Sequence, residues 1–561
     1  MNYDKNVYIP LQSGGVIAAN VYRPQAAGRY PVLLAQSPYP KDAHFSNFHP
    51  AYWKSLTTRH PQVTQGTSAR HMVWEAPDPD RWLPLGYAVV HLDAPGSGRS
   101  PGKLDLLSPA EIGALCEAIE WAAAQPWSNG KVGMLGISYF AMSQWLAASR
   151  QPRGLAAIVP WEGSSDLYRE FNYHGGIRSN AFSDYWWSQV VLRNQHGNPN
   201  NPLVDKDTGE SLAGTATEAS LVAQRAEFPA QASAHPLDDA WHRDRSAVFE
   251  KIDIPLLSAG NWGGLGLHLR GNVEGFVRSA SKQKWLELHT GSHFDRFSLP
   301  EGRAVQQQFF DHFLRGEDNG WLQQPRVRCE LRSSGGSEWV SGDDWPLPDT
   351  QWTRLFLDAS GAGLATTPPS STARASFQAS AEGLTFSTGV LTKPMTILGP
   401  ISLRLVAASS TADMDLFITL RVFKPDGQEM TFFGANDQAA PLTQGWLRAS
   451  HRALDPHLST PWRPYHRHDA VRLLAPEVPV DLDMEIWPTS AVLPAGSRLD
   501  VEISGRDFAR AEPSAARSPF RGSGPFLHTA AERCQPQFDG LTTVFTGPDQ
   551  PSYLLLPLIE R

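Results

Sequence analysis

Short apolar runs alternate with helical patterns along the first part of the chain. The runs that contain almost only apolar residues are residues 31–35, 87–92, 132–135 and 155–159. Such runs are typical of strands that are covered on both faces of a parallel sheet. Between two of them, Ser108-Pro109 opens a helix in which Ile112, Leu115 and Ile119 form one apolar stripe. This rhythm of strand and helix predicts an α/β fold with right-handed crossovers.

The chain departs from this rhythm at its start and again after residue 162. Residues 7–10 and 16–22 flank Ser13-Gly14-Gly15 and predict an antiparallel hairpin. Residues 163 to about 245 are polar, helical in places and rich in aromatic residues, which favours a lid over a pocket; the alternative is that the aromatics form a small core of their own. The sheet pattern resumes at 254–260 and 284–290, and a helix is expected over 302–314.

From about residue 351 the pattern changes to short alternating runs separated by turn signals such as Pro425-Asp426-Gly427. That pattern predicts an all-β sandwich of jelly-roll type. The predicted organisation is therefore an α/β domain in two parts (1–162 and 246–350), an inserted helical cap (163–245) and a C-terminal β domain (351–561).

Composition narrows the class of protein. With 561 residues the chain is too long for one core, and a net charge of −8 without a basic cluster argues against a nucleic-acid partner. No apolar run approaches the roughly 18 residues that a membrane span needs, and the first residues lack the apolar core of a signal peptide. A cytoplasmic protein that does not bind membranes is the default expectation, with a homo-oligomer possible.

The residues that most often bind metals give no pattern. Cys116, Cys329 and Cys534 are far apart and odd in number, so neither a disulfide framework nor a zinc site is expected. His466 and His468 have no carboxylate or cysteine frame and are expected to be loop histidines. We therefore predict no metal and no organic cofactor.

One stretch carries a recognisable chemical signal. The apolar run 132–135 ends at Gly136-Ile137-Ser138-Tyr139, and a helical pattern follows. A serine on a sharp turn between a strand and a helix has its hydroxyl lifted above the sheet edge, and the backbone N–H of Tyr139 can face an oxyanion there. Phe140 stands where the G-x-S-x-G motif has its second glycine, so the motif alone is weak evidence.

A serine nucleophile needs a base, and His293 is the best placed histidine. It follows the last predicted strand directly, whereas His289 lies inside that strand and His312 inside a helix. In hydrolases of this kind the order along the chain is Ser, then Asp or Glu, then His.

Taken together, these motifs resemble the cocaine esterase and X-Pro dipeptidyl-peptidase family of serine hydrolases over nearly the whole chain. The stretches that carry the resemblance are residues 37–41, 87–100, 126–133, 136–139, 165–169, 309–316, 445–450 and 486–488. The resemblance implies an α/β-hydrolase domain, a helical cap and a C-terminal jelly roll. It also implies that Ser138 is the nucleophile, His293 the general base, and the hydroxyl of Tyr39 an oxyanion donor beside the N–H of Tyr139.

The chain departs from the family pattern at two positions. Ala141 replaces a usual glycine, a small change that we expect to affect packing only. The family's acidic residue falls in the stretch Gly260-Asn261-Trp262-Gly263, which contains no carboxylate. We predict Glu162, just past the strand 155–159, as the substitute; the alternatives are Asp166, Glu274, Asp295, or Asn261 as a neutral orienting group.

The predicted function is hydrolysis of a small carboxylic ester, amide or short peptide through an acyl-enzyme. Trp186 and Trp187, with Phe45, Phe48 and Trp74, favour a bulky or aromatic substrate group. An X-Pro dipeptidyl-peptidase, which would need a carboxylate to hold the substrate amine, and an acyltransferase are the alternatives within catalysis. A binding protein with a degenerate site is the alternative outside it.

Overall fold

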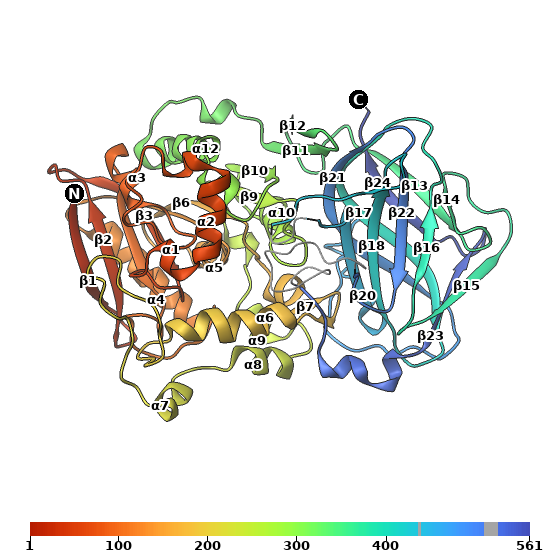
Figure 1. Ribbon diagram of the computed structural model, residues 1–561, viewed down its shortest axis with the longest axis horizontal. Helices are drawn as coiled ribbons and strands as arrows, with labels where there is room; N and C mark the ends of the chain where they lie inside the picture. The colour runs from red at the N-terminus through yellow and green to blue at the C-terminus, as the bar shows by residue number, and fades with distance from the viewer. Residues whose placement is uncertain (436–438, 510–525, 561) are drawn as a thin grey trace.

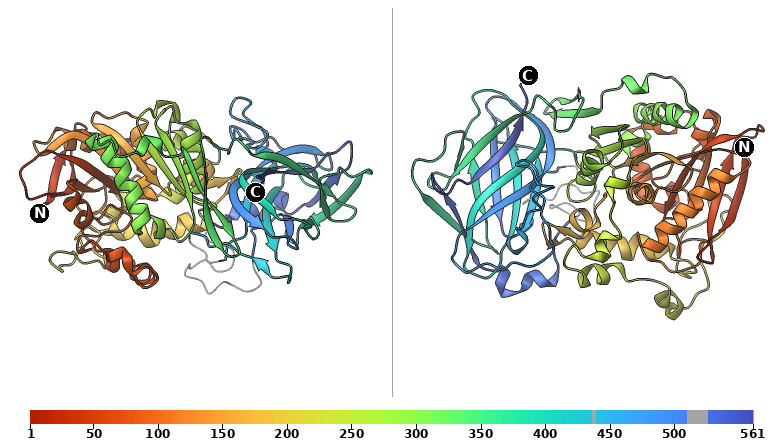
Figure 2. Two further views of the ribbon diagram at one scale, coloured as in Figure 1. Left: turned by 90° about the horizontal axis from the view of Figure 1, so that it is seen from above. Right: turned by 180° about the vertical axis from the view of Figure 1, so that it is seen from behind.

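The computed structural model describes residues 1–435, 439–509 and 526–560. Two halves lie side by side along the long axis of the molecule, an α/β half that begins at the N-terminus and a β half that ends at the C-terminus (Figure 1). The views from above and from behind show the same division (Figure 2). The prediction of an α/β-hydrolase-like part followed by an all-β part is confirmed.

A ten-stranded sheet with the order β1-β2-β4-β3-β5-β6-β9-β10-β11-β12 organises the α/β half. The strands from β4 through β3 to β11 run parallel to their neighbours, and antiparallel pairs flank them at both edges. The bounds are β1 Asn2–Pro10, β2 Val16–Arg23, β3 Tyr30–Ser37, β4 Ala88–Asp93, β5 Ser128–Ile137, β6 Leu155–Trp161, β9 Leu256–Asn261, β10 Lys284–His289, β11 Val327–Ser333 and β12 Gly336–Gly342.

Helices follow the central strands and cover the sheet. They are α4 Pro109–Ala124, α5 Tyr139–Ala148, α10 Leu269–Arg278 and α12 Pro300–Phe310, the last continued by a π-helical turn Asp311–Arg315. Ser108 caps α4, since its side chain accepts the N–H of Glu111, and the Glu111 carboxylate accepts the N–H of Leu107. Because helices cover the strands, β4 is buried at every position and β5 at its last six.

Two irregular segments lie over the sheet. The first, between β3 and β4, contains α1 Phe45–Phe48, α2 Pro50–Arg59, η1 Pro61–Thr64, α3 Pro79–Trp82 and η2 Leu83–Leu85. The second, between β6 and β9, contains η3 Leu167–Asn172, β7 Tyr173–His174, β8 Ile177–Arg178, α6 Ala181–Trp186, η4 Trp187–Val191, η5 Leu192–Asn194, α7 Glu218–Ala223, α8 Phe228–Ala234, α9 Ala240–Arg243 and η6 Phe249–Lys251. The short helices α11 Asp295–Ser298 and η8 Trp321–Gln323 flank α12.

The β half is one sheet with the order β15-β23-β17-β21-β20-β18-β22-β16-β14-β13-β24, and a further pairing of β24 with β17 brings its path back on itself. Its strands are β13 Gln351–Asp358, β14 Gly363–Ala365, β15 Ala373–Gln378, β16 Leu384–Ser387, β17 Met395–Ser409, β18 Asp415–Phe423, β19 Glu429–Met430, β20 Thr443–Arg448, β21 Val480–Leu493, β22 Arg498–Ser504, β23 Leu541–Thr546 and β24 Tyr553–Leu558. Three short 3-10 helices accompany them: η9 Ala449–His451, η10 Ala531–Cys534 and η11 Pro536–Phe538.

The two halves share an interface that is apolar at its centre and carries buried ion pairs. Trp262 and Leu265 after β9 pack in one cluster with Trp446 and Trp487 of the β half. Nearby, Arg270 donates to Glu170 of the α/β half at 3.0 Å and to Glu485 of the β half at 2.9 Å. The β half therefore contacts the α/β half through the segment that follows β9.

The three cysteines, Cys116, Cys329 and Cys534, are all free. Among the residues that the structure describes, none of the helices has both the length and the apolar character needed to cross a membrane.

Candidate active site

Ser138 stands at the carboxyl end of β5, directly before α5. Its backbone angles, φ 58° and ψ −118°, are strained for a residue with a side chain, and they produce the sharp turn that the sequence predicts. Gly136 makes the turn possible: its φ is +155°, and an added Cβ would lie 2.5 Å from Cβ of Phe140. The N–H of Ser138 points at the carbonyl oxygens of Trp161 (3.1 Å) and Glu162 (3.0 Å), so the turn is joined to the end of β6.

Glu162 follows β6 and bonds two histidines through its two oxygens. Its Oε2 lies 2.7 Å from Nδ1 of His293, and its Oε1 lies 3.0 Å from Nε2 of His289. Nδ2 of Asn261, at the end of β9, donates to the same Oε1 at 3.2 Å. Burial alone would raise the pKa of Glu162, but the charges and hydrogen bonds of His293 and His289 hold it at about 2. The carboxylate is thus ionised at any ordinary pH.

His293 lies in the loop after β10 with a carboxylate on each ring nitrogen. Glu162 is at Nδ1, and Oε1 of Glu75 lies 3.2 Å from Nε2. Burial acts to lower the pKa of His293, but the two carboxylates outweigh it and raise the pKa to about 10. The ring of His268 stacks in parallel at a centroid distance of 5.5 Å, and burial lowers the pKa of His268 well below its usual value, so it adds no charge.

Tyr39 follows β3 and presents a neutral hydroxyl beside Ser138. Burial raises its pKa well above the usual value, and its hydroxyl interacts with the Ser138 side chain. The indole N–H of Trp186 donates to the same oxygen at 2.9 Å. With that N–H donated to it, the phenol keeps its own proton to donate. The side chain of Tyr139 is directed elsewhere, and its hydroxyl donates to Glu111 at 2.9 Å.

The other carboxylates that the sequence offered as partners of His293 are engaged elsewhere. Asp166 pairs with Arg169 at 2.8 Å, Glu274 with Arg463 at 3.3 Å, and Asp295 with Arg59 at 2.8 Å. Asn261 contacts Glu162 rather than His293. These contacts leave Glu162 as the carboxylate on Nδ1.

Aromatic side chains crowd one side of the site. Phe45 and Trp74 lie with ring centroids 5.0 Å apart, and both pack against Phe294, the residue after His293. Phe48 and Tyr52 pack against Trp74 as well. Trp187, in contrast, donates to Glu227 and packs near Phe228 of the same insertion, so its contacts connect it to the insertion and not to Ser138.

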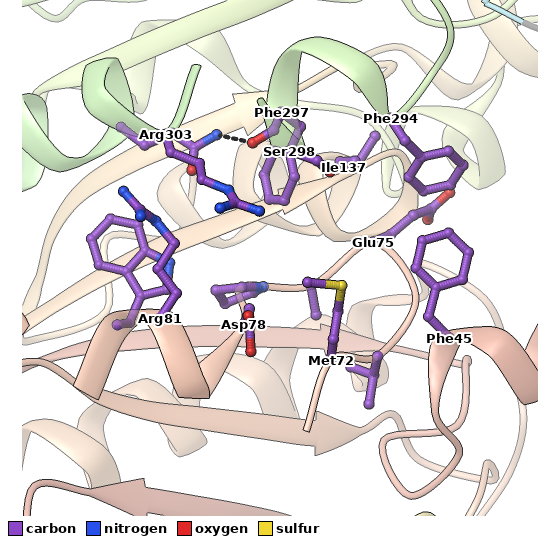
Figure 3. Close-up of a pocket in the computed structure, with 15 residues that line it drawn as sticks. Phe45, Met72, Glu75, Asp78, Arg81, Ile137, Phe294, Phe297, Ser298 and Arg303 are labelled. Carbon is purple, nitrogen blue, oxygen red and sulfur yellow. Dashed lines mark hydrogen bonds between the residues drawn. The ribbon is translucent and has the colours of Figure 1, made fainter. Parts of the chain in front are cut away.

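A cavity of about 40 Å³ lies behind these rings (Figure 3). The Glu75 carboxylate lies with Phe45 and Phe294 at one end, and Asp78, Arg81 and Arg303 surround the other. The volume is enough for one or a few water molecules and too small for a substrate group.

The described residues contain no group of three or more histidine, cysteine or carboxylate side chains that is placed to hold a metal ion. His466 and His468 are buried, and their rings lie 5.7 Å apart. They belong to the β half and take no part in this site.

Glu75 was not predicted from the sequence as a site residue, and His289 was considered only as a possible base. The signal for Glu75 was weak: it is the single acidic residue between Asp42 and Asp78, in a loop that contains many aromatic and basic residues. His289 was set aside because it lies within a strand, yet its place at the end of β10 brings its Nε2 to Glu162.

The geometry defines a class of site. A strained serine at a strand end, a buried carboxylate–imidazole pair and a phenol beside the serine are the parts from which serine hydrolases with an α/β sheet are built.

Comparison with known proteins identifies the family. The family model described as X-Pro dipeptidyl-peptidase (S15 family) matches residues 13–295, and the model of the X-Pro dipeptidyl-peptidase C-terminal non-catalytic domain matches residues 319–555. The chain belongs to this family and is a hydrolase, as the sequence motifs indicated.

Individual relatives agree. The cocaine esterase of Rhodococcus sp. (strain MB1 Bresler) is 28% identical over 99% of this chain and 98% of its own length. The crystal structure of a CocE/NonD family hydrolase from Staphylococcus aureus is 29% identical with a TM-score of 0.86, covering 100% of this chain and 93% of that one. An α-amino acid ester hydrolase shares the fold at a TM-score of 0.67 and 17% identity, over 99% of this chain and 96% of that one.

Proposed function

We propose that this hydrolase cleaves carboxylic esters, and amides more slowly, through an acyl-enzyme on Ser138. His293 is the general base in this proposal, and Glu162 is the acid that orients it. The observation that carries the proposal is the 2.7 Å contact between Nδ1 of His293 and Oε2 of Glu162, whose backbone carbonyl accepts the N–H of the strained Ser138 at 3.0 Å. In serine hydrolases a histidine that a carboxylate holds through Nδ1 uses its Nε2 as the base.

The reaction follows from these positions. Oγ of Ser138 attacks the substrate carbonyl while Nε2 of His293 takes its proton, and the resulting imidazolium is stabilised by Glu162. The hydroxyl of Tyr39 and the N–H of Tyr139 face the oxyanion. The imidazolium then protonates the leaving alcohol or amine, and a water molecule activated by the same nitrogen releases the acid from Ser138.

The aromatic surroundings favour a bulky apolar or aromatic group on the substrate. Phe45, Trp74 and Phe294 form one wall next to His293, and Trp186 reaches Tyr39 from the insertion. The bond from Trp186 supports the further proposal that residues 163–245 act as a cap over the site. For the C-terminal half we retain the jelly-roll topology as a proposal, supported by its antiparallel pairings.

A second candidate is release of X-Pro dipeptides, and Glu75 is the observation that favours it. A peptidase of this kind must hold the free amine of its substrate, and Glu75 places a buried carboxylate beside His293. Oε2 of Glu75 forms no hydrogen bond of ordinary length with the described residues. The esterase comes first because the cocaine esterase match spans nearly the full length of both chains.

The test combines active-site labelling with two substrates. A fluorophosphonate should add to wild-type protein at Ser138, identified by peptide mass spectrometry, and should leave the Ser138→Ala variant unmodified. Turnover of a p-nitrophenyl ester of a bulky aromatic acid should exceed turnover of a Gly-Pro anilide; the reverse order selects the peptidase. Absence of labelling in the wild type at every pH tested, alkaline pH included, would refute the enzyme proposed here and favour a binding protein.

A further inference from the structure

The carboxylate of Glu75 contacts the ring nitrogen of His293 that a serine hydroxyl would need. In the mechanism proposed above, Nε2 of His293 receives the proton of Ser138. In the structure this nitrogen instead lies 3.2 Å from Oε1 of Glu75. Since Glu162 already holds Nδ1, the imidazole is bound by a carboxylate on both sides. An imidazole with both nitrogens donating is protonated and cannot act as a base.

Glu75 is held in this position by the backbone. Its φ is +61°, an uncommon value for a residue with a side chain. Its carbonyl oxygen accepts the N–H of Ile137, the residue just before Ser138, at 2.9 Å. The loop that carries Glu75 is therefore hydrogen-bonded to the turn that carries Ser138. Only 4% of Glu75 is exposed.

Apart from His293, the groups around Glu75 do not neutralise its negative charge. Burial raises the pKa values of Tyr39 after β3 and of Tyr52 on α2, and the negative charge of Glu75 raises both further. Glu162, beyond His293, is a second negative charge. At the far end of the cavity Asp78, Arg81 and Arg303 face the same space. His293 is thus the one cationic partner within hydrogen-bond reach among the described residues.

We propose that Glu75 is a positioning residue that holds Nε2 of His293 in the free enzyme and has to release it before His293 can accept the proton of Ser138. The inference rests on the proposed function and deepens it, because it names what sets the working pH of that site. Activation requires the Nε2 proton to leave for solvent and the carboxylate to give way to the serine hydroxyl.

The consequence is a shifted pH profile. Burial and the charge of Glu162 raise the pKa of Glu75 to about 7, so above that pH both carboxylates are charged and hold the imidazolium. The base is then free only as the pH approaches the His293 pKa of about 10. Below that pKa the reactive fraction should rise about tenfold for each pH unit.

The experiment measures the second-order rate of fluorophosphonate labelling of Ser138 between about pH 6 and pH 10.5. Labelling depends on the base but on no particular substrate. Wild-type protein should reach half its maximal rate above pH 8, compared with about 6.5 for an ordinary histidine. In Glu75→Gln, which keeps the size and removes the charge, the midpoint should fall by about one to three pH units. Labelling at pH 7.5 should then be faster than in the wild type, by up to about tenfold for each pH unit of that fall.

Asp78→Asn is the matched control. Asp78 is a buried carboxylate of the same cavity whose pKa burial raises to about 6, but it caps α3 and does not touch His293. Asparagine also caps helices well, so this variant should fold, and its labelling midpoint should equal that of the wild type.

Three results would overturn the inference. One is a wild-type midpoint near pH 6.5, which needs no variant at all. Another is an unmoved midpoint in Glu75→Gln, and the third is slower labelling of that variant at every pH. Absence of labelling in wild-type protein is a separate outcome, because it refutes the proposed function itself and this inference with it.

Discussion

Glu162 reaches Nδ1 of His293 from the end of β6, the strand next to β9, after which the sequence resemblance places the family's acid. The strand between them, β9, ends in Asn261, which donates from Nδ2 to Oε1 of Glu162 at 3.2 Å. Neighbouring parallel strands end at the same edge of the sheet. A carboxylate at the end of one strand can therefore reach the same imidazole as a carboxylate at the end of the next strand. In the proposed mechanism Glu162 thus takes the place of the carboxylate that is missing after β9, and the side-chain amide of Asn261 donates to it.

The first prediction concerns this replacement. Glu162→Gln should lower kcat by about 10⁴, because the imidazolium formed during attack loses its charge stabilisation and its orientation. The measurement is steady-state hydrolysis of an aryl ester, with circular dichroism to establish that the variant is folded. Near-normal turnover in a folded variant would remove Glu162 from the proposed triad.

The second prediction concerns stability and pH. The pKa of Glu162 is about 2 in the folded protein, below the usual 4.5. A lowered carboxylate pKa stabilises the fold above the unfolded value, and this stability is lost as the pH falls from about 4.5 through 2. The shift corresponds to a contribution on the order of 3 kcal/mol at neutral pH.

Urea unfolding of wild type and Glu162→Gln at pH 7, 5 and 3 tests the sign. The wild type should be the more stable at pH 7 and 5, and the difference should shrink at pH 3. A difference that grows towards low pH would show that the Glu162 pKa is not lowered by His293 and His289.

The third prediction concerns the oxyanion. Tyr39→Phe removes the hydroxyl that interacts with Ser138 and should lower kcat by about 10²- to 10³-fold with a small change in KM. Trp186→Phe is the control, since it removes the indole N–H that donates to the same oxygen but leaves the phenol in place. Equal losses in both variants would mean that Tyr39 acts through its contact with Trp186 and not on the substrate.

Local patterns in the sequence were sufficient to predict most of the fold. Apolar runs predicted β3 to β6 because strands covered on both faces need apolar residues at nearly every position. The turn at Ser138 could be predicted for a similar reason, since it needs glycine at Gly136 and a helix directly after the serine. Both signals lie within a few neighbouring residues of the chain.

Contacts between distant segments could not be predicted in this way. Glu75 is 218 residues from His293 along the chain, and its role depends on how the loop between β3 and β4 folds over the sheet. Such a loop has no periodic pattern to reveal which side chain points inward. Trp187 illustrates the same limit: it follows Trp186 directly, yet its indole N–H donates to Glu227 while that of Trp186 donates to Tyr39.

The last prediction tests the packing at Ala141, where the family usually has glycine. A Cβ added to Gly163 would lie 2.4 Å from the Ala141 methyl, so the methyl of Ala141 fills the space that Gly163 leaves open. Gly163→Ala should therefore destabilise the fold by about 1–3 kcal/mol through overpacking. Ala141→Gly alone should cost about 1 kcal/mol, because it introduces glycine into α5. In the double variant the 2.4 Å contact with the methyl is absent, and the remaining contacts of the added Cβ, 3.0 Å from the backbone carbon of residue 141 and 3.1 Å from N of Met142, are less severe. The unfolding free energy of the double variant should therefore exceed the value expected if the two losses simply added. Urea denaturation of the four proteins measures this coupling; strict additivity would mean that the two positions do not compete for the same space.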